Sequence, residues 1–167
     1  DATTVNIEGG QDVVIGDGSF MSSGQGLSTG SLSAGDAVTV NASEAGGDVS
    51  LELADDREHD ITGSAQNDTF TFTSNPLNTD NSFDDDDVVD GGAGVDSLNA
   101  AGVNGDIGDV QLSNVEIASF GVGGSVDDVI GLAAASGLAA VNVQANINAN
   151  QNVTIEGVTA NTLVSVV

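Results

Sequence analysis

Short segments in which apolar and polar residues alternate recur along this chain, and they constrain its fold more than any other feature. A period of two places the apolar side chains on one face of a β-strand and the polar side chains on the other. Glycine, Asn and Asp fill the intervals, as expected of turns that need a positive φ. The pattern therefore predicts an all-β protein of about ten short strands. The clearest segments are residues 5–8, 38–40, 49–53, 69–72, 110–112, 115–117, 141–144, 153–156 and 163–166.

Residues 125–137 depart from this alternation and predict one short helix. Ser125 is a suitable N-cap, and Asp128 stands three residues later, where an acidic side chain completes a capping box. Gly137 is placed to end the helix. We expect this helix to cover an edge or an end of the β-structure.

The N-terminal part of the chain has a composition of its own. Residues 16–36 are rich in Ser and Gly, which is typical of a flexible linker. We therefore divide the chain into a strand arm with its linker at 1–36 and a β-domain at 37–167. The arm holds strand candidates at 5–7 and 13–15. These strands either pair with their own domain across a long surface loop or insert into a neighbouring copy as donor strands, a form of β-augmentation.

The charge of the chain is strongly negative. Twenty-six acidic residues face a single Arg57 and no lysine, which gives a formal net charge of −25. A nucleic-acid partner is excluded, because phosphate contacts need Lys or Arg. Self-repulsion on this scale destabilises a compact state. The carboxylates therefore either form a solvated surface suited to high salt or bind a hard divalent cation.

Several absences narrow the class of protein. The lack of cysteine fits a secreted protein that fixes its loops with metal, although cytosolic proteins also lack disulfides. Without lysine no Lys-based isopeptide can form, so any polymer of this chain is held non-covalently. No run approaches the roughly 20 apolar residues that span a membrane, so we expect no membrane insertion. HExxH and Ser-His-Asp arrangements are missing, and the only histidine, His59, lies in an acidic segment that predicts a surface loop. We expect no enzyme activity.

The clearest candidate site is the glycine turn at residues 91–99, which fits the pattern G-G-x-G-x-D-x-U-x, with U a large apolar residue. Its glycines allow a tight turn whose carbonyls point inward, and Asp96 adds a carboxylate. Calcium takes about six to eight oxygen ligands, so carbonyl and carboxylate oxygens from adjacent turns suit it. We predict that Gly92, Gly94 and Asp96 contribute ligands to a Ca²⁺ site.

A single turn cannot fill that coordination shell, and further ligands are expected nearby. Residues 63–71 form a degenerate copy of the pattern, which predicts Asn67 and Asp68 as ligands. An insertion between the two copies ends in four consecutive aspartates at 84–87. Adjacent carboxylates repel by about 1 kcal/mol in water, so such a run is most easily tolerated fully solvated or on a cation. On the second interpretation, further ligands come from Asp86, Asp87 and Asp90.

The turn at 91–98 resembles the haemolysin-type (RTX) calcium-binding nonapeptide repeat of secreted bacterial proteins. The stretch from Val89 to Ile117 resembles the repeat unit of calcium-dependent surface-layer proteins of Gram-negative bacteria, and residues 152–158 resemble later strands of such units. The likeness covers residues 60–167. It implies a β-roll or parallel β-helix solenoid with calcium-binding turns, secretion, and a place at the cell surface or in the biofilm matrix. Because one full nonapeptide is present, a β-sandwich with calcium-binding loops is the alternative fold.

These observations together predict a structural subunit of a calcium-dependent extracellular assembly, either a surface layer or a filament. Its partners would be copies of itself, and cell-surface polysaccharide is a further candidate. N-terminal donor-strand exchange is one way in which the copies could join. The alternative function is that of a calcium-binding module of a secreted RTX-type adhesin or toxin.

Overall fold

The computed structural model describes residues 3–15, 37–53, 58–73, 81–123, 126–145 and 151–166. Within these ranges all regular elements are strands, which confirms the all-β prediction, and no helix is present that could cross a membrane. The predicted linker at 16–36 and the expected N-cap Ser125 lie outside the described residues. The strands are β1 (Thr3–Gly9), β2 (Val13–Ile15), β3 (Val38–Ala45), β4 (Val49–Leu53), β5 (His59–Thr62), β6 (Thr69–Phe72), β7 (Val88–Asp90), β8 (Ser97–Val103), β9 (Asp106–Asp109), β10 (Gln111–Ser113), β11 (Ile117–Val122), β12 (Asp128–Gly131), β13 (Ala140–Ala145), β14 (Val153–Glu156) and β15 (Leu163–Val166).

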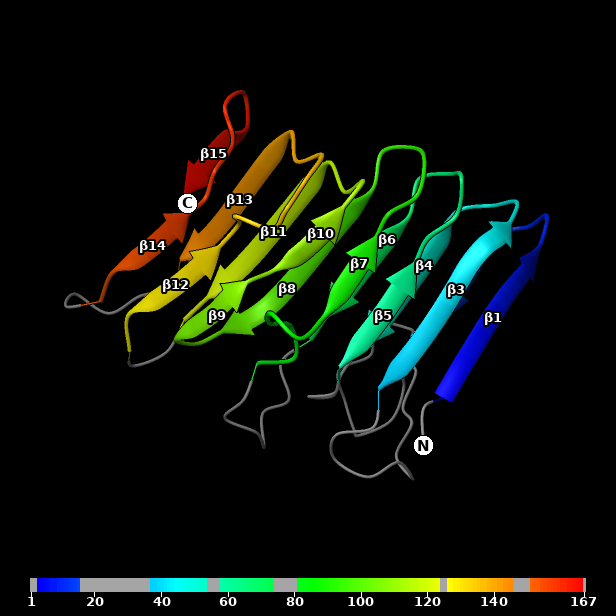
Figure 1. The fold of residues 1–167 in the computed structure, drawn as a ribbon, viewed down its shortest axis with the longest axis horizontal. Helices are drawn as coiled ribbons and strands as arrows, with labels where there is room; N and C mark the ends of the chain where they lie inside the picture. Colours follow the sequence, from blue (N-terminus) through cyan, green and yellow to red (C-terminus); the bar gives the residue numbers. More distant parts are fainter. Residues whose placement is uncertain are drawn as a thin grey trace.

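The strands form three sheets, and every strand pair in them is parallel. A five-stranded sheet has the order β1-β3-β5-β7-β10, a seven-stranded sheet β2-β4-β6-β8-β11-β13-β15, and a three-stranded sheet β9-β12-β14. Up to β8 the chain alternates strand by strand between the first two sheets, so each strand pairs with the one two places earlier. The strands lie side by side from β1 at one end to β14 and β15 at the other (Figure 1).

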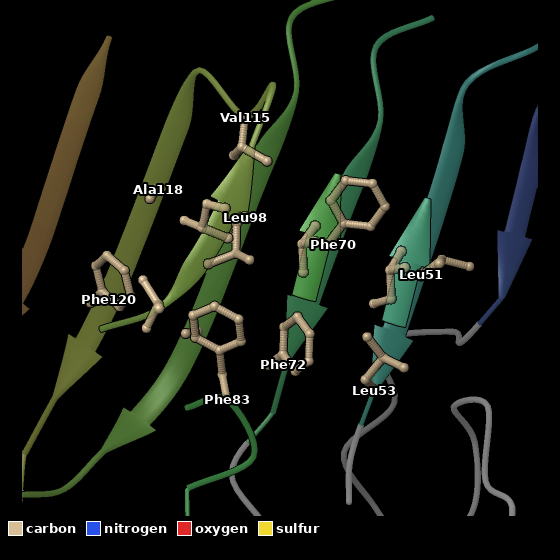
Figure 2. Packing of buried hydrophobic residues seen from close by; sticks show 14 of the residues in the cluster. Leu51, Leu53, Phe70, Phe72, Phe83, Leu98, Val115, Ala118 and Phe120 are labelled. Atoms are coloured by element: carbon tan, nitrogen blue, oxygen red, sulfur yellow. The ribbon is translucent and has the colours of Figure 1, made fainter. Parts of the chain in front are cut away.

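A buried apolar column runs through the seven-stranded sheet and forms the centre of the core. Residues at one register position follow one another across its strands: Leu51 pairs with Phe70, Phe70 with Leu98 and Leu98 with Ala118. All four are at most 1% exposed. Their alternate neighbours in each strand face outward, as the period of two requires. Figure 2 shows these side chains on the same side of the sheet.

Aromatic side chains join the core across the sheets. The ring of Phe83, which comes from the insertion before β7, lies 4.7 Å from that of Phe72 and 6.4 Å from that of Phe120. His59 meets the edge of Phe72 at 5.5 Å between ring centroids and is 1% exposed. The prediction that His59 lies in a surface loop is therefore wrong, because it opens β5 and its imidazole packs into the core.

The helix predicted at 125–137 is also wrong, because a strand takes its place. β12 pairs with β9 on one side and β14 on the other, so its backbone hydrogen bonds are made between strands. The β-branched Val129 and Ile130 favour a strand, and Ile130 is fully buried in it. The Asp128 carboxylate accepts a hydrogen bond from the Gly105 backbone N–H at 2.7 Å and so caps a neighbouring segment.

The two N-terminal strand candidates pair within their own chain. β1 lies parallel to β3, with Val5 opposite Val40, and β2 lies parallel to β4, with Ile15 opposite Leu51. The two strands form one end of the five-stranded and seven-stranded sheets. The strands of the arm are therefore the first pair in the alternation of the chain between these two sheets.

Candidate metal centre

The glycine turn joins β7 to β8, and its shape depends on all three glycines. Gly92 and Gly94 have φ angles of +94° and +131°, which side chains with a Cβ rarely adopt. Gly91 has an ordinary φ, but a Cβ there would lie 2.0 Å from the backbone oxygen of Asn114. The turn therefore packs directly against the backbone of the next connection, between β10 and β11.

Three carboxylates form a ladder along the side of the molecule where this turn lies. Each stands just before a strand of the seven-stranded sheet and accepts a backbone N–H from a residue at, or just before, the start of the neighbouring strand in that sheet. Asp68 accepts from Val49 at 2.8 Å, Asp96 from Asp68 at 2.7 Å, and Glu116 from Asp96 at 2.7 Å. The ladder ties successive connections together through charge-assisted hydrogen bonds, which are stronger than neutral ones.

The two aspartates of the ladder differ in how well the protein satisfies them. Both oxygens of Asp68 have donors, since Ser64 bonds Oδ2 through its backbone N–H and Oδ1 through its hydroxyl at 2.9 Å. In the intact turn Gly92 takes the place of Ser64. It has no hydroxyl, and its N–H donates to Asp90 Oδ1 at 3.1 Å. Asp96 is 0% exposed, and its Oδ2 has no hydrogen-bond partner among the described residues.

The surroundings of Asp96 make its negative charge costly. Burial raises the pKa of Asp96 to about 6, and the charges of Asp68, Glu116 and Asp90 add to the rise, while the hydrogen bond from the Asp68 backbone opposes it. A buried carboxylate oxygen without a donor needs either a proton or a cation. The Asn114 carbonyl oxygen and Asp96 Oδ2 lie 2.0 and 2.7 Å from the point where a Cβ of Gly91 would sit. Carbonyl and carboxylate oxygens are the hard donors that calcium takes, so the residues present fit a Ca²⁺ ion.

The other predicted ligands on this side have protein partners. Asn67 is exposed, and its Oδ1 accepts the Val95 N–H at 2.8 Å. Asp90 is half-buried, and its Oδ1 accepts the Asn114 side-chain amide at 2.7 Å as well as the Gly92 N–H. The structure therefore brings Asn67, Asp68 and Asp90 around the glycine turn, with Asp96 as the buried member that lacks a donor.

Asp86 and Asp87 do not join this site, because they lie at the opposite end of β7. Asp86 is exposed. Asp87 is buried, and its Oδ1 lies 2.9 Å from both the backbone nitrogen and Nδ1 of His59. Its Oδ2 accepts the Asp84 N–H at 3.0 Å, and burial raises the pKa of Asp84. The acidic run is thus a folded turn in which the Asp87 carboxylate holds the start of β5.

Glu116 and Asn114 lie against the candidate site, although the sequence analysis did not name them as ligands. The sequence pattern predicts residues 115–117 as a strand, but in the structure Glu116 lies just before β11. It has the same position relative to β11 that Asp96 has relative to β8, and this equivalence could have identified it. Within the described ranges, no three His, Cys, Asp or Glu side chains gather closely enough to hold a metal by themselves, so a site here must use backbone oxygens. No family model, curated protein or solved structure matches the chain.

Proposed function

We propose that this chain is a structural subunit of a calcium-dependent extracellular assembly at the cell surface or in the biofilm matrix of a Gram-negative bacterium. The observation that carries the proposal is the buried Asp96 Oδ2, which has no protein donor among the described residues and lies beside a backbone carbonyl. A chain with a net charge of −25 gains doubly from calcium, which neutralises this carboxylate and lowers the repulsion between copies.

Calcium would be held at the glycine turn, with Asp96 and the Asn114 carbonyl as its nearest candidate ligands. Asp90 and Glu116 contribute negative charge around the same point, since both raise the pKa of Asp96. At Asp96 the ion would take the place of the donor that Ser64 provides to Asp68 in the degenerate turn. Binding to the folded state alone then adds to the free energy of unfolding.

The finer fold that we propose is a β-roll-like solenoid. Its support is the parallel pairing of every described strand and the alternation of consecutive strands between two sheets. β9 and β10 are separated by Val110 alone, so one chain pass enters the three-stranded sheet and continues into the five-stranded sheet. A sandwich of the common kind is built from antiparallel strands. Solenoid repeats contact only their neighbours, which suits a protein that extends in one direction.

A calcium titration of two matched variants tests the metal site. Asp96→Asn removes the buried charge while keeping an oxygen for the Asp68 N–H, whereas Asp60→Asn removes an exposed carboxylate on β5. At calcium a hundred times the Kd, the wild type should gain about 2.7 kcal/mol of unfolding free energy, and so should Asp60→Asn. Asp96→Asn should lose this gain and be at least as stable as the wild type in chelator. Equal calcium responses in all three proteins, measured by thermal denaturation, would overturn the site.

Assembly is tested separately, by electron microscopy and size-exclusion chromatography with and without calcium. We expect polymers in calcium and single chains in chelator. A chain that calcium stabilises but leaves monomeric would instead be a calcium-binding module of a secreted adhesin or toxin. Because the chain has neither Lys nor Cys, the polymers should dissolve in denaturant without a reducing agent.

A further inference from the structure

The two outer strands of the seven-stranded sheet leave one side of their backbones without a described neighbour. Among the described strands, β2 pairs only with β4, and β15 only with β13. Natural proteins usually protect such edges with charged residues, proline or a covering helix. Neither β2 nor β15 contains a charged residue or a proline, and all four residues of β15 are exposed. These edges therefore suit the addition of another strand.

The register of the sheet shows how the two edges match. One column faces outward and consists of Val14, Ser50, Thr69, Ser97, Ile117, Ala140 and Leu163. Its end members are the most exposed large apolar side chains in the described ranges, with Leu163 74% and Val14 71% exposed. Between these ends the column holds three hydroxyl side chains followed by Ile117 and Ala140, all of them half-buried. The apolar ends thus occupy the same register position on opposite edges.

The inward column ends without a cover at β15. It begins at Ile15, passes through the buried core and ends at Val164, which is 45% exposed. Val166, two residues further along β15, is 60% exposed. Solenoid ends normally carry a polar capping unit that shields the last apolar layer. Nothing in the described residues shields this layer.

Charge is scarce at this end of the molecule. Residues 129–167 contain a single acidic residue, Glu156, of the twenty-six in the chain. Two copies that each carry a net charge of −25 repel one another over most of their surfaces. The end formed by β14 and β15 is where a second copy meets the least repulsion. This distribution favours self-association over binding of a basic partner, which would seek the acidic regions.

We infer that a second copy of this chain docks with its β2 beside β15, parallel and in the register that continues both columns. Val14 of the added copy then lies next to Leu163, and Ile15 of the added copy next to Val164. The inference rests on the proposed self-assembly and names the surfaces that carry it. Because the two surfaces differ and do not close, each added copy presents a new β15 edge and the assembly extends without limit.

The outer strands on the other face of the molecule, β1 and β14, share a short sequence. β1 contains Val5-Asn6-Ile7-Glu8-Gly9 and β14 with its following residue reads Val153-Thr154-Ile155-Glu156-Gly157, so both outer strands carry Val-x-Ile-Glu-Gly. Both glycines have a positive φ, +119° and +71°. Stacking that keeps these segments aligned brings Glu8 towards Glu156. Like charges facing across strands are unfavourable, so calcium or salt should promote assembly.

Cysteine cross-linking tests the docking directly, because these 167 residues contain no cysteine. Val14→Cys and Leu163→Cys are made as separate proteins, mixed in calcium and oxidised mildly. Adjacent strands lie about 4.8 Å apart, which is within the range that a disulfide bridges. We expect a disulfide-linked dimer in the mixture and little from either protein alone. The control mixes Val14→Cys with Val126→Cys, which is 47% exposed and precedes β12, a strand of a different sheet from β2 and β15.

A second pair of variants tests the same surface without cross-linking. Val164→Asp places a charge in the uncovered layer of the terminal strand, and Val126→Asp places one at a site of similar exposure. We expect Val164→Asp to raise the concentration needed for assembly roughly tenfold or more, with unchanged circular dichroism, and Val126→Asp to have little effect.

The outcomes separate the two proposals. If the wild type assembles in calcium but the mixed cysteine proteins cross-link no more than the control, the docking surface is wrong and the proposed function stands. If the wild type does not assemble, or a segment of a longer natural chain covers β15 and keeps it monomeric, both fail. Equal effects of the two aspartate variants also overturn the docking surface.

Discussion

Asp96 shows how one missing hydroxyl changes the chemistry of a turn. In the degenerate copy Ser64 donates hydrogen bonds to both carboxylate oxygens of Asp68. In the intact copy Gly92 provides the positive φ that the turn needs but no donor for Asp96 Oδ2. Under the proposed function, the more regular glycine turn is the one that would depend on an ion, while Ser64 provides both donors that the degenerate turn needs.

The raised pKa of Asp96 predicts a pH dependence of stability in the calcium-free protein. The folded state holds the proton more tightly than the unfolded state, because the pKa rises from 3.8 to about 6 on folding. This group therefore favours folding below pH 3.8, and its contribution is lost as the pH rises through about 6. The free energy of unfolding of the wild type should fall relative to that of Asp96→Asn over this range.

Denaturant titrations at several pH values in chelator check this expectation. With calcium present the trend should reverse, since the proton competes with the ion and calcium affinity should fall below about pH 6. A stability difference between wild type and Asp96→Asn that stays constant with pH would contradict the assignment of the buried charge.

At the scale of elements, β12 shows why a local pattern can be misread. A helix would place Val129 and Ile130 on one face, whereas the strand turns Ile130 into the core and Val129 outward. The capping signal at Asp128 was real in one respect, because this carboxylate does accept a backbone N–H. The donor is Gly105, 23 residues earlier, which no local pattern can reveal.

Two alanine variants distinguish these packings. Ile130→Ala should cost roughly 2–5 kcal/mol of unfolding free energy, because it leaves a cavity in a fully buried position. Val129→Ala, which alters a half-buried side chain on the other face, should cost clearly less. Urea denaturation in calcium measures both. Similar losses at the two positions would favour the shared face of a helix.

The alternation and the glycine turn were the parts of this molecule that the sequence could predict. Alternation depends on burial of one face, so strands such as β4 and β6 were correctly expected. The partners of each strand depend on contacts 19 to 36 residues away, such as Ser50 with Thr69 and Val14 with Ser50. For the same reason Glu116 and the pairing of His59 with Asp87 could not be found from local spacing.

At the scale of the whole molecule, general charge screening and specific calcium binding should be separable. Sodium chloride at about 1 M shortens the screening length to roughly 3 Å and should raise the melting temperature in chelator by reducing self-repulsion. Calcium should add a further rise even at that salt concentration, because Asp96 is buried and poorly screened. Scanning calorimetry at both salt concentrations tests this. If salt alone reproduces the whole calcium effect, the charge matters and the site does not.

The difference between the β2 and β15 edges has a consequence for growth. An assembly built by adding β2 to β15 has a direction. One tip always presents the end formed by β1 and β2, and the other always presents the weakly charged end formed by β14 and β15. Subunits would then arrive and leave at different rates at the two tips. A chain that keeps β2 but has an altered β15 would join one tip and stop it, so a small fraction of Val164→Asp mixed with wild type should shorten the polymers.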